Sequence, residues 1–184
     1  MDRPLRLVAL LVVIAAAVIA AIALLGGDDD DESGSGAAEV ETVKGPEGHA
    51  FTLAKPAGWA EVPADQREEL PGDPLLVLRQ DDQEGLVVVN VQPGKVSNFD
   101  KQVKTLDRRL KKAIPDFRKV GARVVQVKAG EALLYSYART KRGTAHTILV
   151  VPAKQRTYTL NGAVPAGSKK AAQDVGRILL SFDI

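Results

Sequence analysis

Residues 86–114 read LVVVNVQPGKVSNFDKQVKTLDRRLKKAI, and the change of period within this stretch decides the fold. Leu86–Gln92 is rich in β-branched residues, which predicts a buried strand that ends at Pro93-Gly94. From Ser97 to Ile114 the apolar positions recur every three or four residues, which predicts an amphipathic helix. Pro115 then ends this helix because the residue before a proline favours an extended backbone.

The sequence on both sides of this stretch predicts mostly strands, joined as antiparallel hairpins by short loops that contain glycine. A second amphipathic helix is expected at Gly167–Leu180, with Ser168 as its N-cap. Strands that are apolar on both faces need a cover on each side. The expected fold class is therefore α+β, with an antiparallel sheet of six or seven strands sandwiched by helices. The expected strands, besides Leu86–Gln92, are Phe51–Leu53, Leu75–Arg79, Arg123–Lys128, Leu133–Arg139, Ala145–Val151 and Thr157–Ala163.

One N-terminal transmembrane helix is expected before this domain. Leu7–Leu25 is an uninterrupted run of 19 apolar residues, which is about the length that crosses a bilayer as a helix. Arg3 and Arg6 precede the run, so residues 1–6 are expected in the cytoplasm and the rest of the chain outside. The alternative is a cleaved signal peptide, for which 19 apolar residues is a long stretch.

Residues 26–48 are rich in Gly, Ser and acidic residues and poor in large apolar ones. Such a segment cannot bury enough surface to offset the entropy of ordering it, so a flexible acidic tether is expected. The predicted order along the chain is therefore a cytoplasmic N-terminus at 1–6, an anchor at 7–25, a tether at 26–48 and one extracytoplasmic domain at 49–184. The predicted location is the cell membrane, with a single pass.

The composition excludes several classes of site. The chain has no Cys and only two His, which leaves no thiolate zinc site, Cys nucleophile or disulfide framework. No cofactor is expected, since no glycine-rich phosphate loop is present. The net charge of +2 hides a strong asymmetry along the chain, because residues 27–92 carry 16 acidic and 4 basic residues and residues 93–128 carry 3 and 11.

The predicted helix at 97–114 carries the most informative surface. Its apolar stripe is expected to face the sheet, which directs a row of bases toward solvent. An anionic lipid, an anionic wall polymer or an acidic protein surface would suit this row, whereas nucleic acid does not fit the predicted location. The alternative is a solvated helix face without a partner. The residues of this candidate surface are Lys101, Lys104, Arg108, Lys111 and Lys112.

Catalytic patterns are weak. Ser136 and Ser181 are conceivable nucleophiles with His146 as the base, but no Gly-x-Ser-x-Gly elbow is present, and His146 is interpreted as a structural strand residue. The carboxylate pairs Glu68-Glu69 and Asp81-Asp82 fall in predicted loops and are interpreted as surface charge. Similarly, Trp59, Tyr135 and Tyr137 are interpreted as core residues rather than as a ligand groove.

Residues 51–59 read FTLAKPAGW, a strand that runs into Pro-Ala-Gly-Trp. This opening, together with the order of elements that follows, resembles the PsbP-like α/β/α sandwich superfamily over about residues 49–184. The superfamily includes the extrinsic PsbP subunit of the photosynthetic oxygen-evolving complex, a fungal nuclear-import factor and bacterial cell-envelope lipoproteins. The resemblance implies a fold and a habit of binding partners, and it implies no catalytic residues.

Many envelope members of this superfamily carry a lipid on a Cys, and Leu7–Leu25 would take the place of that anchor here. The sequence therefore indicates a single-pass membrane-anchored extracytoplasmic binding or accessory protein of the bacterial cell envelope, without catalysis. The alternative is a secreted or anchored envelope hydrolase with an unrecognised pocket.

Overall fold

The computed structural model describes residues 40–184, apart from residues 68, 69, 71 and 83. Nine strands and three helices follow one another in this part of the chain. In chain order they are β1 (Glu41–Lys44), β2 (Thr52–Lys55), β3 (Trp59–Glu61), α2 (Ala64–Arg67), β4 (Leu76–Gln80), β5 (Leu86–Pro93), α3 (Phe99–Ala113), β6 (Phe117–Val127), β7 (Gly130–Arg139), β8 (Thr144–Pro152), β9 (Arg156–Pro165) and α4 (Lys169–Leu180).

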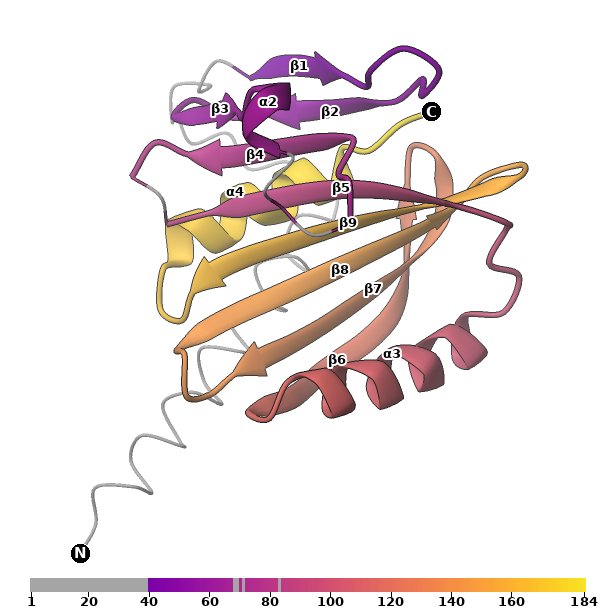
Figure 1. The fold of residues 1–184 in the computed structure, drawn as a ribbon, viewed down its shortest axis with the longest axis vertical. Coiled ribbons are helices and arrows are strands. Elements are labelled where there is room, and N and C mark those ends of the chain that lie inside the picture. Colours follow the sequence, from indigo (N-terminus) through magenta and orange to yellow (C-terminus); the bar gives the residue numbers. More distant parts are fainter. Residues whose placement is uncertain (1–39, 68–69, 71, 83) are drawn as a thin grey trace, which may run out of the picture.

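Seven strands form one antiparallel sheet in the order β3-β4-β5-β9-β8-β7-β6, and β1 and β2 form a separate two-stranded sheet. Figure 1 shows α3 and α4 on opposite sides of the large sheet. The predicted sheet of six or seven strands with a helix on each face is therefore confirmed. The predicted strand at Phe51–Leu53 falls in the small sheet rather than in the large one.

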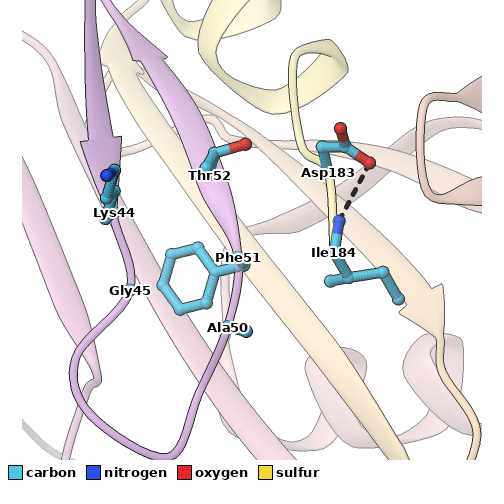
Figure 2. A pocket seen from close by; sticks show the side chains of 7 residues that line it. All are labelled: Lys44, Gly45, Ala50, Phe51, Thr52, Asp183 and Ile184. Carbon is cyan, nitrogen blue, oxygen red and sulfur yellow. Dashed lines mark hydrogen bonds between the residues drawn. The ribbon is translucent and has the colours of Figure 1, made fainter.

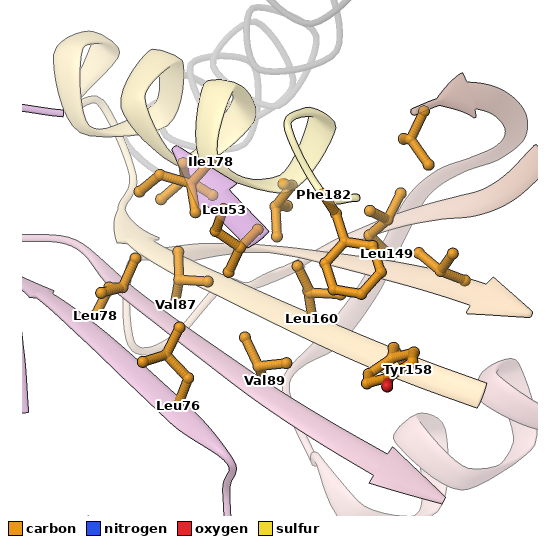
Figure 3. Packing of buried hydrophobic residues seen from close by; sticks show 14 of the residues in the cluster. Leu53, Leu76, Leu78, Val87, Val89, Leu149, Tyr158, Leu160, Ile178 and Phe182 are labelled. Atoms are coloured by element: carbon orange, nitrogen blue, oxygen red, sulfur yellow. The ribbon is translucent and has the colours of Figure 1, made fainter. Parts of the chain in front are cut away.

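The main core lies between the large sheet and α4. Figure 3 shows Ile178 at the end of α4 and Phe182 just beyond it packing over Val87, Val89 and Leu160 of β5 and β9. The helix comes close to the sheet because Gly162 of β9 has no side chain: a Cβ there would lie 2.3 Å from Cγ1 of Val175. Trp59 and Leu53 of β2 add to the same core, which confirms Trp59 as a core residue.

The second core lies on the other face of the sheet, under α3. Leu133, Tyr135 and Tyr137 of β7 and Ile148 and Val150 of β8 are buried there. The α3 side chains that cover them are only half-buried, which differs from the fully buried stripe of α4. Tyr135 and Tyr137 are thus core residues, as predicted from the sequence.

Strand β1 corrects the boundary expected for the flexible tether, residues 26–48. Residues 41–44 pair with β2, with Glu41 opposite Lys55 and Lys44 opposite Thr52. Lys55 Nζ lies 2.6 Å from the Glu41 carboxylate, and Val43 packs against the main core. The folded domain therefore includes Glu41, because pairing with the next strand and packing against the main core order a segment whose own residues are mostly polar and exposed.

Strand β6 corrects a second expectation. It begins at Phe117 rather than at Arg123, and its register against β7 shifts between Lys119 and Gly121. This bulge interrupts the alternation of apolar and polar residues, so the first half of the strand does not show the usual period in sequence. Ser168 is the N-cap residue of α4, as predicted, but its hydroxyl makes no capping hydrogen bond there.

The predicted transmembrane segment at residues 7–25 and the acidic run at 28–32 lie outside the described residues. Within the part of the chain that the structure describes, no helix is both long and apolar enough to cross a membrane.

Candidate functional site

Helix α3 carries the candidate surface, and its ends are fixed locally. The Asn98 side chain accepts a hydrogen bond from the Lys101 backbone N–H at 2.8 Å, which caps the first turn. At the other end, the Ile114 N–H donates to the Leu110 carbonyl, and Ile114 takes the extended backbone expected before Pro115. The helix is therefore a rigid support for the side chains on its outer face.

A polar tie holds α3 to the sheet. Tyr135 Oη donates to Asp107 Oδ1 at 2.5 Å, and Lys119 Nζ lies 2.8 Å from Asp107 Oδ2. Burial alone would raise the pKa of Asp107, but the hydrogen bonds from Lys119 and Tyr135 hold it below its usual value. Burial, and then the hydrogen bond to Asp107, raises the pKa of Tyr135. Asp107 is thus ionised and engaged with the sheet, so it does not neutralise the outer face of α3.

The five predicted surface residues are all exposed, and none of them forms an ion pair with another described residue. Of the two acidic residues in the helix, Asp107 points to Tyr135 and Lys119, which leaves Asp100 in the first turn. The structure therefore presents Lys101, Lys104, Arg108, Lys111 and Lys112 as a row of solvated positive charge on a helix that is held from the opposite side.

Sequence reasoning missed four bases that the fold brings toward the C-terminal end of α3. Lys141 and Arg142 lie in the β7–β8 turn, and their backbone N–H groups donate to Asp116 Oδ2 at 2.9 and 3.3 Å. Lys169 and Lys170 begin α4, which follows a hydrogen bond from the Ala166 N–H to the Gly143 carbonyl. Only the pairing of distant segments places these bases together, so no local signal in the sequence could have found them.

The environment of His146 does not suit general-base catalysis. Its ring stacks on Tyr137 with 4.7 Å between centroids, and its Nε2 lies 2.9 Å from the Thr144 hydroxyl. Burial, and then the charge of Arg139, lowers the pKa of His146 to about 4. A general base works best when its pKa is close to the operating pH, so His146 is a poor base at neutral pH.

The two candidate serine nucleophiles do not contact His146. Ser136 Oγ lies 3.5 Å from Thr147 Oγ1, and Ser181 Oγ donates to the Ile178 carbonyl while accepting from the Ala54 N–H. Of the carboxylate pairs, Glu68-Glu69 lies outside the described residues, and Asp81-Asp82 is exposed in the β4–β5 turn. Among the described residues, no group of three His, Cys, Asp or Glu is placed to hold a metal ion.

Two hollows lie at the end of the sheet opposite to the β7–β8 turn. One, of about 310 Å³, lies between the β1–β2 hairpin and the last residues of the chain, and Phe51, Lys44 and Asp183 are in its lining (Figure 2). The other, of about 450 Å³, lies beside Phe99 at the start of α3, next to Lys95 and Glu131. Each has one Lys and one carboxylate, and neither contains a His or another arrangement of nucleophile and base.

No protein-family model matches the sequence, and no curated protein matches it. Solved structures do match the fold. The solution structure of cyanobacterial PsbP (CyanoP) from Synechocystis sp. PCC 6803 matches with a TM-score of 0.58 at 13% identity, over 86% of this chain and 99% of that one. LpqN, which is involved in cell envelope biogenesis of Mycobacterium tuberculosis, matches with a TM-score of 0.55 at 15% identity, over 79% of this chain and 91% of that one. The domain therefore has the PsbP-like α/β/α sandwich fold that the opening FTLAKPAGW and the order of elements suggested.

Proposed function

We propose that this chain is a membrane-tethered accessory protein of the bacterial cell envelope, and that its folded domain binds an anionic partner outside the membrane without catalysing a reaction. The row of five exposed bases on α3 carries this proposal, since their charge is not neutralised by described acidic residues. The 19 apolar residues at 7–25 support the anchor. The shared fold with LpqN is consistent with an envelope role.

The position of the row favours partner binding over a purely structural role. The bases lie on the side of α3 that faces away from the sheet, and the apolar stripe and Asp107 make the contacts that hold the helix. Unneutralised like charges in a row attract polyanions and repel one another, although salt screens both effects. Binding through these residues therefore requires no change in the fold.

Two results carry the non-catalytic part of the proposal. The proposed base of the alternative hydrolase, His146, has a pKa of about 4. The two serines considered as nucleophiles, Ser136 and Ser181, form hydrogen bonds with groups other than His146. Turnover of an envelope substrate by the purified chain, abolished by a single point substitution, would contradict this part.

Binding is tested with the full chain held in neutral lipid nanodiscs and with poly(glycerol phosphate) as an anionic polymer. We expect binding that weakens by at least tenfold between about 50 and about 500 mM salt, because the contacts are electrostatic. The variant with Lys104, Arg108 and Lys112 changed to Glu should lose binding and keep its fold. The control reverses the exposed Lys95, Lys128 and Lys154, which lie outside the α3 row, in loops at the end of the sheet where α3 begins, and should retain binding. Binding that ignores salt and the α3 reversal would overturn the proposal.

The anchor is tested separately by extracting bacterial membranes that contain the full chain with alkaline carbonate. An uncleaved anchor keeps the chain in the membrane at its full length, whereas a cleaved signal releases a shorter soluble chain. Deletion of residues 7–25 should leave the protein in the cytoplasm.

A further inference from the structure

We propose that the end of the domain formed by the C-terminal turn of α3, the β7–β8 turn and the start of α4 is a docking surface for a bilayer that contains anionic lipid. We call this surface the basic rim. It goes beyond the α3 row because four of its six bases come from other segments, and it rests on the proposed membrane anchor. The basic rim consists of Lys111, Lys112, Lys141, Arg142, Lys169 and Lys170, all of which are exposed.

Hydrogen bonds around Asp116 join the first two parts of the basic rim. Asp116 follows α3 by three residues, and it accepts backbone hydrogen bonds from Lys141 and Arg142 at its carboxylate and from Thr140 at its carbonyl. The β7–β8 turn is therefore fixed directly against the end of α3. Four bases of the rim thus lie on neighbouring segments.

The third part of the basic rim joins through the same turn. The Ala166 N–H donates to the Gly143 carbonyl at 2.6 Å, which holds the approach to α4 against the residue after Arg142. Lys169 and Lys170 then begin the helix. Because α3 and α4 cover opposite faces of the sheet, the rim extends across the full thickness of the sandwich (Figure 1). A broad surface formed by turns and helix ends is better shaped to bind an extended surface than a small ligand.

The acidic groups near the basic rim leave its charge largely intact. The side chain of Asp116 is only 5% exposed, and Arg139 Nε lies 3.5 Å from its Oδ1. Burial alone would raise the pKa of Asp116, but the N–H groups of Lys141 and Arg142 and the charge of Arg139 hold it below its usual value. Its negative charge is therefore neutralised from inside the domain. Glu84, which accepts a hydrogen bond from Ser168 at 2.6 Å, marks the border toward the acidic β4–β5 turn.

The position at which the chain enters the domain favours a bilayer as the partner of the basic rim. Glu41 begins β1 opposite Lys55 of β2, and the turn after β2 contacts the β4–β5 turn through a hydrogen bond from the Asp81 N–H to the Gly58 carbonyl. The β4–β5 turn in turn contacts Ser168. The first strand thus begins at the same end as the basic rim. A membrane anchor that precedes residue 41 would place this end toward the bilayer, where each base near an anionic surface adds to the attraction.

The test uses the full chain in vesicles of neutral lipid and in vesicles with about one third anionic lipid, a content that gives a strongly negative surface. The chain has no native Cys, so Ala113→Cys beside the basic rim and Gln155→Cys at the opposite end each accept one fluorescent label. A quencher on the lipid headgroups then reports which label lies closer to the bilayer. We expect stronger quenching at position 113 with anionic lipid, and loss of the difference at high salt.

The variant with Lys141, Arg142 and Lys170 changed to Glu should abolish the difference between the two labels. The matched reversal of Lys95, Lys128 and Lys154 changes the charge by the same amount at the other end and should preserve it. Equal quenching at both labels with anionic lipid, or a difference that survives the rim reversal, would overturn the inference. Retention of the chain in neutral vesicles tests the anchor separately. If the chain dissociates from neutral vesicles but binds anionic vesicles with the label at position 113 closer to the bilayer, the result supports the basic rim and contradicts the anchor.

Discussion

Helices α3 and α4 cover opposite faces of one sheet, yet they are attached to it in different ways. Seven of the twelve residues of α4 are buried, whereas none of the fifteen residues of α3 is. Helix α4 approaches the sheet over Gly162, and α3 rests on the large rings of Tyr135 and Tyr137 and is tied by Asp107. Helix α4 therefore belongs to the core, while α3 is a peripheral helix whose outer face can change without loss of the fold.

Truncation of one large side chain on each helix measures this difference most directly. Ile178 of α4 is fully buried, so Ile178→Ala should lower the free energy of unfolding by about 3 kcal/mol through lost burial and a residual cavity. Leu106 of α3 is only half-buried, and Leu106→Ala should lower the free energy of unfolding by about 1 kcal/mol, because the truncation removes less buried apolar surface than Ile178→Ala does. Urea unfolding curves of the two variants and the parent chain give both values. Equal losses would show that α3 is as much a part of the core as α4.

The sequence predicted both helices because their apolar positions recur at helical spacing, and this period survives whatever the depth of burial. It could not predict which helix lies deeper, since that depends on Gly162 opposite Val175 and on the tyrosines opposite α3. Strand β1 was missed for a related reason: its order comes from pairing with β2 and not from a pattern of its own, since its residues are mostly polar. Sequence periodicity reports the face of an element but not its partner.

The same distinction holds for the candidate site. The exposure of the five bases on α3 followed from the helical stripe, because the apolar residues fix which side faces the sheet. The basic rim could not be predicted, because Lys141 reaches the end of α3 through a hydrogen bond to Asp116, which is 25 residues away in the chain. Contacts of this range depend on the order of the strands.

Acid should weaken the α3 side of the sandwich selectively, because His146 lies on that face and stacks on Tyr137. The pKa of His146 is about 4 in the folded chain and about 6.5 when unfolded, so the unfolded state binds more protons between these values. The stability of the fold therefore falls as the pH drops from about 6.5 to about 4, by about 2 kcal/mol after allowance for the partial exposure of the ring.

The variant His146→Gln isolates this contribution. It loses the stacking contact at every pH, but it has no proton to bind, so its unfolding free energy should fall less between pH 7 and pH 4 than that of the parent chain. The carboxylates titrate in both proteins and cancel in the difference. Urea unfolding at several pH values measures it, and parallel pH profiles of the two proteins would show that His146 is not the group that responds.

The smallest effect concerns the N-terminal caps of the two helices. Asn98 accepts a hydrogen bond from the Lys101 N–H at 2.8 Å, and α3 has no buried residue to hold its first turn. Asn98→Ala should therefore cost about 1 kcal/mol and speed amide exchange at the start of the helix.

Ser168 makes no capping hydrogen bond, and its hydroxyl donates instead to the exposed Glu84. Ser168→Ala should then cost about 0.5 kcal/mol or less, because α4 is held by its buried face. Unfolding curves and amide exchange on both variants measure the two effects. A larger loss of unfolding free energy from Ser168→Ala than from Asn98→Ala would contradict the view that α3 depends more than α4 on the cap at its N-terminus.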